Sequence, residues 1–249
     1  MVRALILGGT SDAHLLADAL AQAECDAIYS YGGRTRAPPD RPVPTRVGGF
    51  GGVSGLADYL RERNITHVVD ATHPFAVEIS RNAVAACAVA KTPLIALERA
   101  PWSKTSGDQW IEVADISSAV AALPDARARV FLAIGRQHIG AFSAKPQHAY
   151  TLRFVDAPDG ELPLREADVV VARGPFELTG ELALMRERHI EWIVARNSGG
   201  EGGRAKIDAA RELGLPVVMI KRPELPDRLQ VESVAEVMHW LGHRACLGA

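Results

Sequence analysis

Short apolar runs recur along the chain, and stretches with helical periodicity separate them. The runs are nearly continuous rather than alternating, which is typical of parallel strands that are covered on both faces. We predict strands over residues 4–7, 27–31, 67–71, 94–97, 130–134, 150–155, 169–172, 192–195 and 217–220, and helices over 13–23, 54–64, 75–90, 177–189 and 204–213. Alternation of this kind predicts an α/β fold with mostly parallel sheets.

The rhythm of strands and helices breaks between residues 98 and 112, where the chain reads ERAPWSKTSGDQWIE. We therefore predict a domain boundary near residue 99, with one domain over 1–98 and a second over 99–249. Two Rossmann-like lobes with a cleft between them account for nine strands better than one very wide sheet does.

Composition and charge argue against several classes of protein. The 249 residues are 47% hydrophobic and 23% charged, with a net charge of −2, so there is no global basic field for nucleic acid. Cys25, Cys87 and Cys246 have no paired spacing, which argues against disulfides or a zinc ribbon and fits a reducing cytoplasm. No apolar stretch approaches the ~20 residues of a membrane helix. We expect a cytoplasmic monomer or weak homo-oligomer that binds no metal, nucleic acid or membrane.

A glycine-rich turn follows the first predicted strand, in the stretch LILGGTSDA. It departs from the Rossmann fingerprint G-x-G-x-x-G/A, because Thr10 replaces the central glycine. The physical basis survives: Gly8 and Gly9 permit a tight turn, and the N–H groups of a helix N-terminus attract an anion. Thr10 and Ser11 can add hydroxyl donors, whereas Asp12 would repel a phosphate placed too close, or face a ribose, or cap the helix. Alternatively, the turn only caps the helix; its place after the first strand favours nucleotide binding.

The end of the second predicted strand bears on the choice of nucleotide. NAD-binding proteins place an acidic residue there for the ribose 2′-hydroxyl. This chain instead reads GGRTR, which brings Arg34 and Arg36 to that position. Arginines suit a 2′-phosphate, so the sequence favours NADPH over NADH, unless both are solvated loop residues.

The stretch VVDATHPFA places Thr72 and His73 after another predicted strand, where ligand crevices of α/β sheets open. His73 would contact the pyrophosphate or nicotinamide end of the cofactor, or donate to a substrate acid. The alternative is structural: His73 caps the next helix, and Thr72 satisfies backbone groups.

A second glycine cluster, ARNSGGEGGRAKIDAARELG, opens a helix in the second half of the chain. It is a candidate anion pocket. Two earlier predicted strands also end near an arginine and a glycine, which predicts a basic, glycine-lined wall facing the other lobe rather than scattered surface arginines. The candidate substrate-binding residues are Arg136, Arg173, Ser198, Gly199, Gly200, Arg204 and Lys206.

Three motifs in this order, GGTSDA, DATHPFA and NSGGEGGRAKIDAARELGLPVVMIKRP, make the chain resemble the precorrin-6A reductases of cobalamin biosynthesis. The resemblance implies a two-lobed Rossmann-like enzyme that uses NADPH to reduce one double bond of the precorrin-6A macrocycle, giving precorrin-6B. A tetrapyrrole with many acetate and propionate groups would suit the predicted basic wall, since arginine forks and helix N-termini are natural carboxylate partners.

His73 and Lys206 are the candidate proton donors, although both could instead hold carboxylates. Lys206 is expected to be the carboxylate ligand, because a lysine needs a large downward pKa shift to act as an acid near pH 7. The open alternatives are a cobalt-precorrin-6A reductase, a two-lobed sugar-nucleotide glycosyltransferase and a non-catalytic NADP sensor. Short-chain dehydrogenase chemistry is excluded, since the nearest match to its Tyr and Lys four residues apart is Tyr59 with Arg63.

Overall fold

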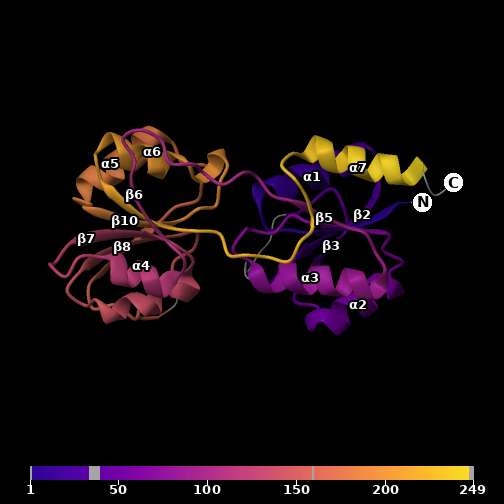
Figure 1. Ribbon diagram of the computed structural model, residues 1–249, viewed down its shortest axis with the longest axis horizontal. Helices are drawn as coiled ribbons and strands as arrows, with labels where there is room; N and C mark the ends of the chain where they lie inside the picture. The colour runs from indigo at the N-terminus through magenta and orange to yellow at the C-terminus, as the bar shows by residue number, and fades with distance from the viewer. Residues whose placement is uncertain (1, 34–39, 159, 247–249) are drawn as a thin grey trace. The chain divides into compact units, whose positions relative to one another are not determined.

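The computed structural model describes residues 2–33, 40–158 and 160–246, and it divides the chain into two units (Figure 1). Unit 1 comprises Met1–Ala100 and Glu224–Ala249, and unit 2 comprises Pro101–Pro223. Each unit contains a six-stranded sheet in which every pair of neighbouring strands is parallel. The predicted α/β fold with two Rossmann-like lobes is therefore confirmed.

The strands of unit 1 lie in the order β12-β5-β4-β1-β2-β3. Their bounds are β1 (Arg3–Leu7), β2 (Asp26–Tyr31), β3 (Thr45–Val47), β4 (His67–Asp70), β5 (Leu94–Leu97) and β12 (Leu229–Val231). Helices α1 (Ser11–Gln22) and α7 (Val234–Cys246) cover one face, and α2 (Gly52–Glu62) and α3 (Val77–Ala90) cover the other (Figure 1).

Successive residues of β1 show why this strand is apolar throughout. Ala4 and Ile6 belong to the core cluster under α1 and α7, whereas Leu5 and Leu7 belong to the cluster under α2 and α3. Because side chains alternate between the two faces of a sheet, a strand covered on both faces must be apolar at every position.

The strands of unit 2 lie in the order β6-β11-β10-β7-β8-β9. Their bounds are β6 (Gln109–Val113), β7 (Arg129–Ala133), β8 (Ala149–Phe154), β9 (Ala167–Val171), β10 (Trp192–Arg196) and β11 (Pro216–Ile220). The helical elements are α4 (Ile116–Ala122), α5 (Leu178–Glu187) and α6 (Ala205–Glu212), with the 3₁₀ segments η1 (Arg136–Ala144) and η2 (Glu201–Gly203).

Both sheets reverse their strand order at one place. In unit 1 the chain proceeds outward from β1 to β3 on one side and from β4 to β5 on the other, so the switch point lies between β1 and β4. In unit 2 the equivalent point lies between β7 and β10. Ligands of open α/β sheets bind at the carboxyl ends of the strands at such switch points.

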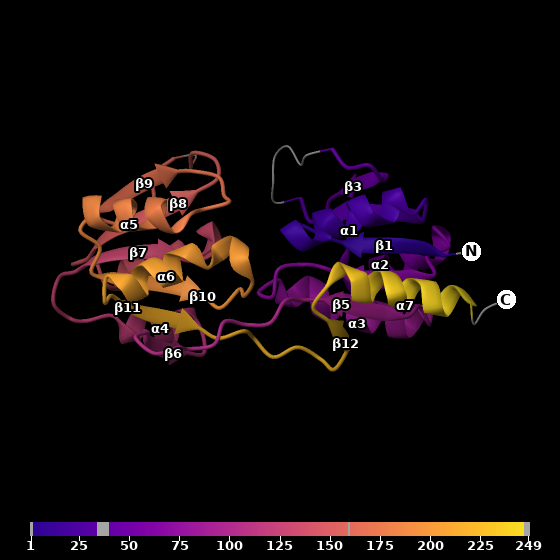
Figure 2. The same cartoon turned by 90° about the horizontal axis from the view of Figure 1, so that it is seen from above.

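One strand of the unit 1 sheet, β12, comes from a part of the sequence far from the other five (Figure 2). After β5 the chain enters unit 2, where β6 pairs with β11; after β11 it returns to unit 1, where β12 pairs with β5. The predicted second domain, 99–249, is wrong in this respect, because 224–249 belong to unit 1. Val237 and Leu241 of α7 pack in the core cluster that contains α1, and β12, only three residues long, carries too little pattern to be seen in sequence.

Within the residues described, no helix is long and apolar enough to span a bilayer.

Candidate active site

The switch point of unit 1 brings together two of the motifs that the sequence singled out. The register of the parallel pair β1–β4 sets Leu7 beside Asp70, so the glycine turn after β1 and the loop after β4 start side by side. A hydrogen bond joins them directly, since the Thr10 hydroxyl donates to the Ala71 carbonyl over 2.8 Å. The first half of the predicted site is therefore one contiguous structure.

The two glycines of the turn are needed for different reasons. A Cβ atom at Gly8 would overlap the ring of Tyr29, which packs against the backbone there. Gly9 has a φ of 121°, a conformation that side chains rarely adopt, and its N–H donates to the Tyr29 hydroxyl over 2.8 Å. Burial raises the pKa of Tyr29 to about 12, so the phenol stays neutral beneath the turn.

Thr10 is not available as the hydroxyl donor to a phosphate that the sequence had suggested. Its hydroxyl accepts from the N–H of Ala13 over 3.1 Å as the N-cap of α1 and donates its hydrogen to Ala71, so it has no hydrogen left for a phosphate. The donors at this helix end are backbone groups instead. The N–H groups of Thr10, Ser11 and Asp12 have no partner among the described residues.

Arg99 resolves the ambiguity about Asp12 and was missed in the sequence. Its Nε lies 2.9 Å from the Asp12 carboxylate, and a terminal nitrogen donates to the Ser11 hydroxyl over 3.2 Å. The ion pair compensates the carboxylate charge that would repel a phosphate. Arg99 follows β5 by two residues, so the strand-end rule that singled out Arg136 and Arg173 could have found it.

The loop after β4 holds Thr72 and His73 in defined roles. The Thr72 hydroxyl donates to Asp70 Oδ1 over 2.7 Å, and its N–H lies 3.2 Å from the same oxygen. His73 is exposed, and its Nδ1 accepts from the N–H of Phe75 over 3.2 Å. With Nδ1 as acceptor, the neutral ring carries its hydrogen on Nε2, and a second proton would cost the bond to Phe75.

The residues predicted to select NADPH, Arg34 and Arg36, lie outside the described residues. Their assignment to a 2′-phosphate therefore stays a prediction.

The switch point of unit 2 is built around the loop that follows β10. Asn197 makes a reciprocal pair with the backbone of Trp102: its Oδ1 accepts from the Trp102 N–H over 2.7 Å, and its Nδ2 donates to the Trp102 carbonyl over 2.8 Å. The Trp102 indole donates to the Gly200 carbonyl over 2.7 Å. Arg222 donates to the carbonyls of Asn197 and Ser198 over 3.0 Å each. Side chains remote in sequence thus engage the carbonyls of this loop.

The N–H groups of the same loop are left unengaged. Those of Gly199, Gly200, Glu201 and Gly202 have no partner among the described residues. Gly199 and Gly200 have φ values of 68° and 66°, in the left-handed region that glycine adopts more readily than other residues. Concave runs of N–H groups of this kind bind anions such as carboxylates.

Lys206 lies next to this loop. Its Nζ donates to the Gly203 carbonyl over 2.7 Å and lies 5.1 Å from the Trp102 ring centroid. Burial lowers the pKa of Lys206 to about 8; the nearby Arg153 adds to the effect and Glu181 opposes it. A lysine with a pKa this far below its usual value can act as an acid near neutral pH.

The arginines of the predicted wall do not all reach the switch point. Arg136 lies three residues after the end of β7 and is exposed, and Arg204 pairs with Asp208 over 3.1 Å. Arg173 follows β9, which β8 separates from β7, and it lies 4.0 Å from Asp156 on the surface. The end of β9 is therefore not adjacent to the ends of β7 and β10, because strand order in the sheet differs from order in the sequence, and the assignment of Arg173 to the substrate stays a prediction.

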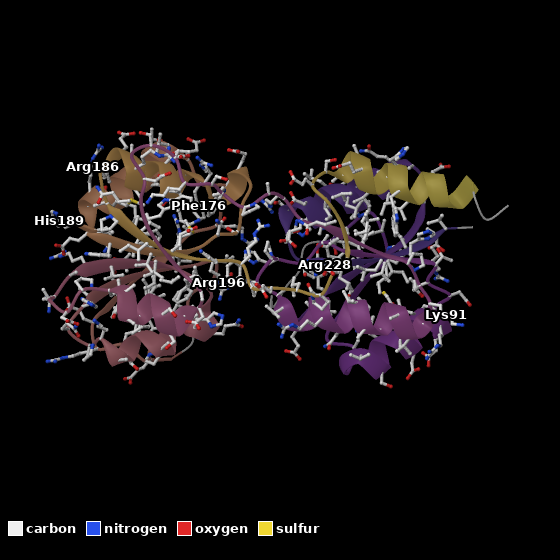
Figure 3. All side chains as sticks on the ribbon, viewed as in Figure 1. Lys91, Phe176, Arg186, His189, Arg196 and Arg228 are labelled. Atoms are coloured by element: carbon white, nitrogen blue, oxygen red, sulfur yellow. The ribbon has the colours of Figure 1, made fainter. Side chains whose placement is uncertain are left out.

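Arg196, the last residue of β10, is a better member of the unit 2 site than Arg173 (Figure 3). Its guanidinium lies against Gly135, where a Cβ atom would come within 3.4 Å of it. This places a cation between the ends of β7 and β10.

Comparison with known proteins agrees with this architecture. The family model described as Precorrin-6x reductase CbiJ/CobK matches residues 3–242. A precorrin-6A reductase of Rhodobacter capsulatus is 55% identical over 97% of this chain and 96% of its own length, and one of Sinorhizobium sp. is 46% identical over 96% and 94%. The solved structure of a CobK precorrin-6A reductase, 55% identical, superposes with a TM-score of 0.94 and covers 98% of this chain and 97% of that one.

Relatives named cobalt-precorrin-6A reductase are more distant. That of Priestia megaterium is 29% identical over 95% of this chain and 97% of its own length. The match of the family model along nearly the whole chain, together with these identities, shows that the chain belongs to the precorrin-6x reductase family.

Proposed function

We propose that this chain uses NADPH to reduce one double bond of precorrin-6A to precorrin-6B, with the cofactor on unit 1 and the macrocycle on unit 2. The observation that carries the division of roles is the difference between the two switch points. Unit 1 offers a glycine turn and a helix N-terminus, and unit 2 offers a loop of unengaged N–H groups beside Lys206. A reduced nicotinamide is the hydride source that reductases of this kind need.

The turn after β1 fits a dinucleotide. The backbone N–H groups of Thr10, Ser11 and Asp12 would hold the pyrophosphate, and Arg99 offsets the charge of Asp12. A side chain at Gly8 would enter Tyr29, so the backbone, not a side chain, forms the surface of the turn. The preference for NADPH over NADH rests on Arg34 and Arg36 following β2.

The loop after β10 fits the carboxylates of the substrate. N–H groups from Gly199 to Gly202 and the Lys206 ammonium can each serve as a carboxylate partner, while Trp102 and Arg222 keep the loop in place. The metal-free macrocycle is the substrate we favour over its cobalt form, because the relatives named for the metal-free compound are far more similar to this chain.

Lys206 is the group we assign as proton donor. With a pKa of about 8 it is protonated at neutral pH and still able to release its proton. His73 is less suited to this role, because accepting a second proton would break its bond to the Phe75 N–H. We assign His73 Nε2–H instead to a hydrogen bond with the cofactor.

The test is an anaerobic assay of the full chain with NADPH and precorrin-6A, followed at the nicotinamide absorbance. The reductase proposal fails if oxidation does not exceed the enzyme-free rate. Replacing Arg34 and Arg36 by Ala should weaken NADPH binding about 10- to 100-fold and NADH binding little, since the 2′-phosphate alone loses charged hydrogen bonds. The matched control replaces Arg61 and Arg63, which are at the end of α2, and should leave both affinities unchanged.

A further inference from the structure

We infer that Arg228 is a positioning residue for the loop that carries Thr72 and His73, and that it acts through Asp70. The inference rests on the proposed function, which assigns His73 of this loop to a hydrogen bond with the cofactor. Arg228 itself comes from the segment that returns from unit 2 and precedes β12 (Figure 3).

A single arginine serves two buried carboxylates at the ends of adjacent strands. One terminal nitrogen of Arg228 lies 3.2 Å from Asp70 Oδ2, and the other donates to Glu98 Oε2 over 2.7 Å. The three side chains are 7%, 1% and 10% exposed. Because Asp70 ends β4 and Glu98 follows β5, the guanidinium spans two strand ends next to the switch point.

Asp70 passes this constraint to the loop. While Oδ2 faces Arg228, Oδ1 accepts from both the N–H and the hydroxyl of Thr72, and the same hydroxyl lies 3.3 Å from Ser80 of α3. The carboxylate thereby has one orientation in which both oxygens are engaged. Thr72 is followed directly by His73, so fixing the Asp70 rotamer fixes the start of the loop that carries the imidazole.

The chemistry calls for an arginine at this position. A guanidinium presents its donors as a rigid fork and can engage two carboxylates at once, whereas the ammonium of a lysine is a single point of charge. A neutral residue would leave Asp70 without this cation in a buried place, where an uncompensated carboxylate is costly. Its freedom to turn would then loosen both bonds to Thr72.

A cavity of about 480 Å³ makes the idea testable by chemical rescue. It is lined by Arg228 and Asp227 together with Trp240 of α7 and Lys91, and it opens to solvent at the end of α3. Because Arg228 lines this cavity, we expect Arg228→Ala to extend it toward the space of the lost guanidinium. Added guanidinium ion can therefore reach the two carboxylates from outside.

The experiment measures kcat and the dissociation constant of NADPH for the full chain, with precorrin-6A as substrate. Arg228→Ala should lower kcat about 10- to 100-fold, since small misplacements of reacting groups cost this much, and change NADPH affinity little, because the glycine turn is untouched. Millimolar guanidinium should restore part of kcat, and sodium should not. The matched control is Arg3→Ala, which removes an arginine 3.3 Å from Asp26 at the amino ends of β1 and β2 in the same sheet and should keep full kcat.

The variant Arg228→Lys covers the case in which Arg228→Ala does not fold. It keeps a cation near Asp70 and should give an intermediate kcat. A folded variant with wild-type kcat, or a loss that guanidinium does not reverse and that follows only the melting temperature, would overturn the inference while leaving the proposed function intact. Absence of NADPH oxidation by the wild-type chain would instead overturn both.

Discussion

Gly8→Ala probes the contact on which the proposed cofactor turn depends. The new Cβ would overlap the ring of Tyr29, and the Tyr29 hydroxyl must keep its 2.8 Å bond to the Gly9 N–H. Relieving the overlap shifts either the ring or the turn. Overpacking costs about 1–3 kcal/mol of stability, and weakening the hydrogen bond costs about 1 kcal/mol more. The free energy of unfolding should fall by about 2–4 kcal/mol, which lowers the melting temperature by roughly 5–15 °C. NADPH affinity should drop about tenfold or more, because the displaced turn misplaces its N–H donors.

Thermal unfolding followed by circular dichroism and NADPH titration followed by fluorescence measure the two effects. The control is Gly49→Ala, where a Cβ meets no atom of the described residues within 4 Å. Adding Tyr29→Leu to Gly8→Ala should recover part of the stability by making room, but not the affinity, since the partner of Gly9 is gone. Wild-type melting and wild-type affinity of Gly8→Ala would refute the account of this turn.

Three further predictions concern unit 2. Above pH 8 the activity of the wild type should fall as Lys206 loses its proton. Lys206→Arg should lose activity, because an arginine does not release its proton near neutral pH. Retained activity without the fall above pH 8 would contradict the assignment of Lys206 as the acid. The folded-state pKa of Lys206 lies below the unfolded value of about 10.4, so the unfolded chain binds more protons between about pH 8 and pH 10. The free energy of unfolding should therefore rise over this range. Denaturation measured as a function of pH should show no such rise for Lys206→Met. Trp102→Phe should raise the KM for precorrin-6A several-fold, with NADPH affinity as the unchanged control, because the 2.7 Å bond to Gly200 is lost. It should cost about 1–3 kcal/mol of stability, because part of a buried ring is lost together with that bond.

The sequence predicts the strands that form continuous apolar runs, most of which are buried on both faces. All nine expected strands exist, because each is a continuous apolar run. The strands that were missed lie at sheet edges. Thr45–Val47 and Leu229–Val231 are three residues long, and Gln109–Val113 alternates, with Trp110 buried and Ile111 39% exposed. Edge strands have less to bury, so their pattern is weaker.

The same contrast holds for the candidate site. Glycine turns show in the sequence because their conformation needs particular residues, and both lie at the switch points. The side chains that fix these turns do not show, because their partners are remote along the chain: Trp102 bonds to Asn197, 95 residues away, and Arg228 to Asp70, 158 residues away. Only the folded chain reveals such pairs.

The two segments that cross between the units supply these residues. The chain crosses between the units twice, and each crossing carries a residue that holds a switch-point loop on either side of it. Arg99 holds the start of α1 in unit 1, and Trp102, three residues later, holds the loop after β10 in unit 2. On the way back, Arg222 holds that same loop and Arg228 holds Asp70. In a chain of two separate Rossmann-like domains the linker would make no such contacts. Here each crossing segment holds a switch-point loop in each unit, so substitutions in these segments should alter turnover or substrate binding as well as the connection between the domains.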